Sequence, residues 1–289
     1  MGIYDTINKL EELRKKIQSQ VYIIIVPFAL WIVFGMFSSV VGPGLLSFAQ
    51  IFMIVFFVAA IPYMKKSQNV KKEFQRLYKQ TFVTQALSER FQNVNYMWES
   101  GFTQDAVRMF NLVQMGNRFK TEDYLSADYN GIHFEQADVT VQYHTSGKNS
   151  HTTTYFKGRM FAFDFPYKNV ASVRCLSNTF MYKASSKNNK LKLESGMFNK
   201  IFKIDAFYEH DAFYFLTPQM MERIESLNAR YGNVALHLMG NKLFVAINMA
   251  SDAFDHDYRQ KVEYIEEIKK INRDTQVIVD IIDTLSLYA

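Results

Sequence analysis

The longest neutral stretch of the sequence constrains the fold most. Residues 17–64 are 48 consecutive positions without Asp, Glu, Lys or Arg. Two apolar runs within it, Val21–Val41 and Leu45–Tyr63, are separated by Gly42-Pro43-Gly44. Each run is about 20 residues long, and a helix of that length spans about 30 Å, the thickness of the hydrocarbon layer of a bilayer. The pattern predicts a transmembrane hairpin of two helices over residues 21–63.

Two other interpretations of this stretch are disfavoured. A helical hairpin buried in a soluble protein would need two helices with no charged face, which soluble proteins rarely contain. A cleaved signal peptide has an apolar core of only about 7–15 residues, and no second span follows it.

Basic residues flank both ends of the neutral stretch, and the short turn has none. Because Lys and Arg near span ends favour the cytoplasmic side, both termini are expected there. Anionic headgroups attract such residues, and tyrosine rings favour the same interface. The membrane-interface candidates are Tyr22, Tyr63, Lys65, Lys66, Lys71, Lys72 and Arg76.

The remaining composition excludes several protein classes. The net charge of +5 is modest, and its clearest basic cluster lies beside the predicted membrane spans. No RNA-binding motif, zinc-finger spacing or arginine-rich arm is present, so we expect no nucleic-acid partner. The single cysteine, Cys175, cannot form an internal disulfide, and its apolar surroundings predict a buried structural thiol.

Periodicity divides the chain into four predicted parts. Residues 1–20 form an amphipathic helix, and residues 21–63 the transmembrane hairpin. Residues 64–95 form a helical stalk, because no Gly, Ser or Pro cluster interrupts them. Residues 96–289 form a cytosolic domain.

Alternating patterns within the last part predict strands on either side of Asn130-Gly131, over residues 152–165 and 170–177, and on either side of Gly240-Asn241. Thr217-Pro218 is typical of a helix start. A further helix is expected to begin at Ser251 or Asp252, and a clear apolar stripe marks the C-terminal helix. The fold class is therefore α+β: an N-terminal two-helix transmembrane hairpin, then a mostly antiparallel β domain with flanking helices.

Four blocks of the sequence are distinctive: TEDYLSADYNGIHFEQADV (121–139), YFKGRMFAFDF (155–165), LESGMFNKIFKIDAFYEHDAFYFLTPQMMERI (193–224) and NKLFVAI (241–247). These blocks resemble a known bacterial family, the membrane-anchored domain of unknown function 3137. The resemblance implies a membrane anchor and carries no established activity. Together with the basic flanks of the neutral stretch, it predicts a multi-pass protein of the bacterial inner membrane with both termini cytoplasmic.

Candidate chemistry is sparse. Lys157 and Arg159 lie two residues apart on a predicted strand, so they share a face and are candidates for binding an anion. A solvent-facing basic pair is the simpler interpretation. Asp252, Asp255, His256 and Asp257 suggest either a metal site or an acidic helix start. His210-Asp211 suggests acid–base chemistry or a structural turn. No nucleotide-binding or hydrolase motif is present, so no cofactor and no catalytic residue is assigned.

Two functions follow from these observations. The leading hypothesis is a membrane-anchored adaptor or regulator of a membrane assembly, without evident catalysis. Its partners would be the lipid bilayer and either a membrane protein or further copies of the chain. The alternative is a membrane-associated enzyme that binds a lipid or an anion, for which Lys157 and Arg159 are the candidates.

Overall fold

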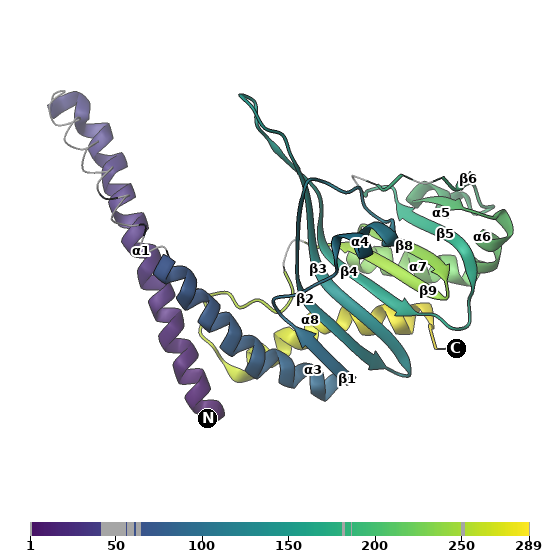
Figure 1. Ribbon diagram of the computed structural model, residues 1–289, viewed down its shortest axis with the longest axis horizontal. Helices are drawn as coiled ribbons and strands as arrows, with labels where there is room; N and C mark the ends of the chain where they lie inside the picture. Colours follow the sequence, from purple (N-terminus) through teal and green to yellow (C-terminus); the bar gives the residue numbers. More distant parts are fainter. Residues whose placement is uncertain are drawn as a thin grey trace. The chain divides into compact units, whose positions relative to one another are not determined.

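The computed structural model describes residues 2–41, 56, 61, 65–180, 183–185, 187–249 and 252–288. The chain forms two compact units. Unit 1 comprises Met1–Val83 and Asp255–Lys269, and unit 2 comprises Thr84–Phe254 and Lys270–Ala289. Figure 1 labels most of the helices and strands.

Unit 1 contains one long helix and the beginning of the predicted stalk. Helix α1 runs without a break over Ile3–Val41, so no boundary separates the predicted amphipathic helix from the first predicted span. Residues 65–78 are helical and continue into the π-helix η1 (Lys79–Val83). The π-helix then leads into helix α3 (Thr84–Arg90), the first element of unit 2, so the helix predicted beyond Lys65 is confirmed.

The membrane prediction is not supported by the described residues. Among the described helices, none is both long enough and apolar enough to cross a bilayer. Most of the second predicted span lies outside the described residues, together with the Gly42-Pro43-Gly44 turn and Tyr63.

An irregular segment packs into unit 1 where a helix was predicted. Phe254, in unit 2, adopts a left-handed backbone conformation (φ 57°), which interrupts any helix through it. In the residues that follow, the Tyr258 carbonyl accepts hydrogen bonds from Arg14 (3.3 Å) and Gln18 (2.9 Å) of α1. The prediction of a helix from Ser251 or Asp252 is therefore wrong: the last helix, α8, spans Tyr264–Leu285.

A buried polar group holds this segment in unit 1. The imidazole Nδ1 of His256 lies 2.8 Å from Glu267 Oε1, and the Tyr78 hydroxyl donates to Glu267 Oε2 at 2.6 Å. Lys79 forms an ion pair with Asp255 at 3.2 Å. These contacts hold the segment within unit 1 in an irregular conformation, so its apolar residues do not form a helical stripe.

Unit 2 is built on a sheet in which the structure describes nine strands. Neighbouring strands pair antiparallel in the order β1-β2-β3-β4-β9-β8-β5-β7-β6, which confirms the predicted antiparallel α+β character (Figure 1). The strands are β1 (Gln92–Met97), β2 (Arg118–Tyr129), β3 (Ile132–His144), β4 (Thr152–Asp164), β5 (Val170–Ser177), β6 (Asn189–Leu191), β7 (Phe202–Ala206), β8 (Val234–Gly240) and β9 (Lys242–Asn248).

Local sequence signals set the turns and helix starts of unit 2. Asn130 (φ 49°) and Gly131 (φ 78°) are both left-handed, as a two-residue hairpin between β2 and β3 requires. Thr217 caps helix α7 by accepting a hydrogen bond from the Met220 amide, so the predicted helix start is confirmed. The other helices of unit 2 are α4 (Gln104–Phe110), α5 (Gly196–Ile201), α6 (Glu209–Phe215), α7 (Pro218–Tyr231) and the part of α8 from Lys270 onward.

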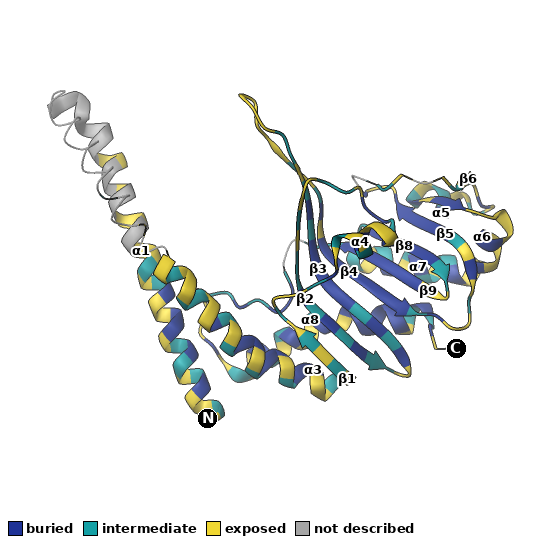
Figure 2. Cartoon of the chain, in the orientation of Figure 1, coloured by how far each residue is buried: buried dark blue, intermediate teal, exposed yellow. Residues whose placement is uncertain are grey.

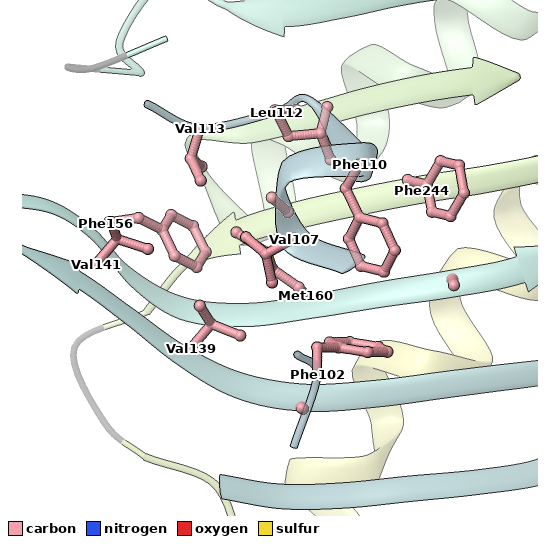
Figure 3. Packing of buried hydrophobic residues seen from close by; sticks show 14 of the residues in the cluster. Phe102, Val107, Phe110, Leu112, Val113, Val139, Val141, Phe156, Met160 and Phe244 are labelled. Carbon is pink, nitrogen blue, oxygen red and sulfur yellow. The ribbon is translucent and has the colours of Figure 1, made fainter. Parts of the chain in front are cut away.

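Helices cover both faces of the sheet. On one face, Val107 and Phe110 of α4 pack in an apolar cluster with Met160 and Phe244 (Figure 3). The preceding residue of β4, Arg159, pairs with Asp274 of α8. Because consecutive strand residues point to opposite faces, α4 and α8 lie on opposite faces of the sheet. Figure 2 shows the central strands buried along most of their length.

Candidate ligand pocket

A pocket lies at the end of the sheet formed by β5, β7 and β6. Its volume is about 750 Å³, within the roughly 300–1,000 Å³ that small-molecule sites occupy. Part of the loop that joins β5 to β6 also lines it. We call it the lysine pocket because its lining includes Lys183, Lys190, Lys192 and Lys203.

A buried ion pair lies beneath the lysines. Arg174 of β5 and Asp205 of β7 face each other across the strand register, and both line the pocket. The guanidinium donates from Nε to Oδ1 (3.0 Å) and from Nη2 to Oδ2 (2.9 Å), and its Nη1 donates to the Asn111 carbonyl at 2.7 Å. This two-bond geometry holds both side chains in place and neutralises the Asp205 charge.

Asn188 ties the loop above the pocket to the sheet. Its amide donates to Ser172 Oγ (2.9 Å) and to Asp205 Oδ1 (3.0 Å). Ser172 in turn lies 2.9 Å from Nε2 of His237, whose Nδ1 lies 2.9 Å from the Phe110 carbonyl. The pocket therefore has a preorganised floor.

The Ser172–His237 pair fits a structural role. Burial lowers the pKa of His237, and the nearby Arg174 charge lowers it further, against the hydrogen bond to Phe110. A neutral ring donates from Nδ1 to the carbonyl and accepts from the Ser172 hydroxyl at Nε2. Ser172 does not line the pocket, so this pair positions the Asn188 loop and is not offered as a nucleophile and base.

The four lysines carry positive charge that the described residues do not balance. Within the described part of the chain, no ion pair joins any of them to a carboxylate, because Asp205 is engaged by Arg174. Burial lowers the pKa of Lys183, and the positive charge of Lys203 lowers it further. The pocket thus presents like charges that an anion would neutralise.

A single alternation is the one signal of this site that the sequence contains. Lys190 and Lys192 are two residues apart, and the residues just before them are polar. Lys183 precedes them and Lys203 follows a helix. Only the pairing of β6 with β7, and of β7 with β5, brings the four together.

The predicted anion-binding pair lies elsewhere in unit 2. Lys157 and Arg159 do share a face of β4, as the alternation requires. Lys157 is exposed and pairs with Asp252 at 3.3 Å. Arg159 is buried, 3.6 Å from Asp138 and 3.4 Å from Asp274. Each cation therefore faces carboxylates of the chain itself.

The other singled-out residues divide by environment. Tyr22 and the basic residues Lys65, Lys66, Lys72 and Arg76 are exposed in unit 1, and Lys71 is half-buried. In unit 2, Cys175 is fully buried, and burial raises the pKa of its thiol, as expected for a structural residue.

The acidic and histidine clusters do not assemble a site. Asp252 pairs with Lys157, Asp255 with Lys79 and Asp257 with Arg259. Asp211 accepts a hydrogen bond from the Ala171 amide at 2.8 Å, which anchors α6. Among the described residues, no group of three or more His, Cys, Asp or Glu side chains has the arrangement of a metal site.

Comparisons with known proteins support a family and no activity. No curated protein matches the chain. One solved structure, that of the mycobacterial trehalose monomycolate transport factor A (TtfA), matches over 70% of this chain and 94% of its own, at 12% identity and a TM-score of 0.38. These values are too low to carry an argument about fold or function.

The family model described as "Protein of unknown function (DUF3137)" matches residues 154–287. That range contains all but the first two residues of β4, strands β5 to β9 with the whole lining of the lysine pocket, and all of α8. Residues 154–287 of this chain therefore match the DUF3137 family model, in agreement with the sequence resemblance.

Proposed function

We propose that this protein is a non-enzymatic adaptor or regulator of a membrane assembly, and that unit 2 recognises an anionic group on its partner. One observation carries the proposal: four lysines that form no ion pair with any described carboxylate line a pocket of about 750 Å³. Clustered positive charge attracts anions over several ångströms and binds them through charge-assisted hydrogen bonds.

The pocket favours recognition over catalysis. Arg174 and Asp205 satisfy each other, and His237 is held between Ser172 and a backbone carbonyl. Neither group is placed to move a proton to or from a bound molecule in the pocket. The alternative hypothesis is an enzyme that binds a lipid or an anion. This proposal keeps the anion binding but not the catalysis, and it assigns the binding to the lysine pocket in place of Lys157 and Arg159.

The membrane location is part of the same proposal and rests on the sequence. The neutral residues 17–64 and the basic residues on both sides of them support an anchor in the bacterial inner membrane with both termini cytoplasmic. The partner is a membrane protein or a further copy of the chain.

Titration with a small polyanion tests the recognition half directly. Full-length protein in mild detergent is titrated with inorganic tripolyphosphate by calorimetry. We expect saturable binding that weakens at least about tenfold in K190Q/K192Q, because a tenfold loss corresponds to about 1.4 kcal/mol for two charged contacts.

The matched control removes the same charge elsewhere in unit 2. Arg118 of β2 and Lys148 of the loop between β3 and β4 are exposed and do not line the pocket, so R118Q/K148Q should bind within about twofold of the unmodified protein. Absence of saturable binding, or an equal loss in both double variants, would count against the proposed recognition site, because overall charge would then explain the result.

A further inference from the structure

Strand β6 is the last strand of the sheet as the structure describes it. It spans Asn189–Leu191 and pairs with β7 on one side, and no described strand pairs with its other side. Alternate residues of an edge strand direct backbone N–H and C=O groups outward. The lysine pocket lies along this edge, since Lys190, Leu191 and Lys192 all line it.

The charges along this edge are spaced as a strand spaces its side chains. Lys190 lies in β6, and Lys192 directly follows the end of β6 at Leu191. Residues two apart on a strand are about 6.6 Å apart, so a chain that stays extended past Leu191 gives the two lysines this spacing. Lys203 lies on the adjacent strand β7, and Lys183 on the loop above. The positive charges are therefore distributed along the edge and are not concentrated at one point.

We propose that the lysine pocket receives an extended acidic segment of a partner protein, which adds to β6 as a further antiparallel or parallel strand. This inference rests on the proposed function and names the chemistry of its partner. The backbone of the segment would bond to the outer edge of β6, and acidic side chains at every second position would face Lys190 and Lys192. Complementary charge selects the partner, and the strand pairing sets its register.

A compact phosphate ligand fits these observations less well. It would contact the lysines near one point and leave the backbone edge of β6 unused. A second interpretation is that Lys190 and Lys192 only protect a short edge strand from aggregation, as lysines on edges often do. It does not account for Lys203 on β7 or for Lys183 in the loop between β5 and β6.

The test uses full-length protein and capped eight-residue peptides in which Glu alternates with Thr. The reference peptide has the same composition with its Glu residues in one block. We expect the alternating peptide to bind at least about tenfold more tightly than the block peptide, and K190Q/K192Q to abolish most of that difference. Hydrogen exchange should slow at residues 189–192 when the alternating peptide binds.

Backbone methylation separates strand addition from charge attraction. One version of the alternating peptide is N-methylated at the Glu amides and another at the Thr amides. Because only alternate residues of a strand face its neighbour, one version should lose binding and the other should keep it. Equal binding by both versions, or by alternating and block peptides, overturns the proposed strand addition.

The outcomes also separate this inference from the proposed function. If tripolyphosphate binds saturably but all peptides bind equally, the result supports the anion site and contradicts strand addition. Binding of neither probe removes both. If K190Q/K192Q self-associates while its peptide affinity is unchanged, the two lysines guard the edge only, and the inference fails.

Discussion

At the scale of single residues, the least expected environment belongs to Asp138 of β3. It is buried opposite Arg159, with 3.6 Å between Asp138 Oδ1 and Arg159 Nε, and its Oδ2 accepts a hydrogen bond from the Ala253 amide. Burial raises the pKa of Asp138 to about 7, despite the opposing effect of Arg159. Its protonation is therefore linked to the segment that leaves β9.

This linkage predicts how stability varies with pH. The folded state holds the Asp138 proton up to about pH 7, whereas an unfolded aspartate releases it near pH 3.9. The unfolded state therefore binds fewer protons between these values, and this group makes the free energy of unfolding fall as pH rises. In D138N, whose Oδ1 can still accept from Ala253, the slope from pH 5 to 6.5 should be less negative by up to about 1.4 kcal/mol per pH unit.

Urea unfolding of unit 2, followed at several pH values in the original and D138N proteins, measures this slope. The difference between the two curves isolates Asp138, because the other titrating groups are common to both. Parallel curves across the whole range would show that Asp138 ionises in the folded protein as it does in the unfolded one.

At the scale of elements, each residue of the Phe156-Lys-Gly-Arg159 block of β4 fits a different environment in the sheet. Phe156 packs in the core on the α4 face, and Arg159 forms its ion pairs on the α8 face. Between them, Gly158 pairs with Asn248 of β9. A Cβ at Gly158 would lie 2.1 Å from the Ile247 carbonyl oxygen and 2.7 Å from the Met249 nitrogen, both backbone atoms. Here the close approach of β9 requires glycine.

The substitution G158A should therefore destabilise unit 2 strongly. The backbone of β9 cannot move aside as a flexible side chain would, so we expect a loss of about 3 kcal/mol or more in the free energy of unfolding. The control is G196A at the start of α5, where an added Cβ meets nothing within 4 Å and the expected change is within about 0.5 kcal/mol. Thermal and urea unfolding measure both; similar losses in the two variants would contradict the close approach.

At the scale of the whole molecule, the chain comprises two compact units, and segments distant in sequence contribute to each. Unit 1 combines the N-terminal helices with Asp255–Lys269, and unit 2 holds the sheet and the lysine pocket. The proposed adaptor role needs both: an anchor supplied by the neutral N-terminal stretch and a recognition surface supplied by the sheet.

The proposed membrane location makes a prediction about the entire chain. A phosphatase reporter fused after Ala289 should be inactive, whereas a fluorescent reporter that folds only in the cytoplasm should be active, because basic residues on both sides of residues 17–64 favour the cytoplasmic face. Alkaline carbonate should fail to extract the chain. If carbonate extracts the chain, or if the phosphatase reporter is active, the proposed membrane anchor is wrong.

Local signals in the sequence predicted the elements that depend on neighbouring residues. Asn130-Gly131 specifies a turn by its backbone preferences, and Thr217-Pro218 starts α7 by its hydroxyl cap and missing N–H. The prediction of a helix from Ser251 or Asp252 is wrong because the spacing of the apolar residues there is equally consistent with a segment that packs irregularly. Left-handed Phe254 and the contacts of Tyr258 with α1 decided that structure.

The candidate site shows the same division. Alternation alone placed Lys157 and Arg159 on one face, but it carried no information about Asp138, Asp252 and Asp274, which engage them. The antiparallel character of unit 2 and its hairpins could be predicted from the sequence alone, since they follow from short-range periodicity and turn chemistry. The quoted sequence blocks carried the resemblance to the DUF3137 family. Tertiary structure decided where charge is left unbalanced: strand pairing gathers Lys183, Lys190, Lys192 and Lys203, and Arg174 occupies the nearest carboxylate, because electrostatics depends on distance in space and not along the chain.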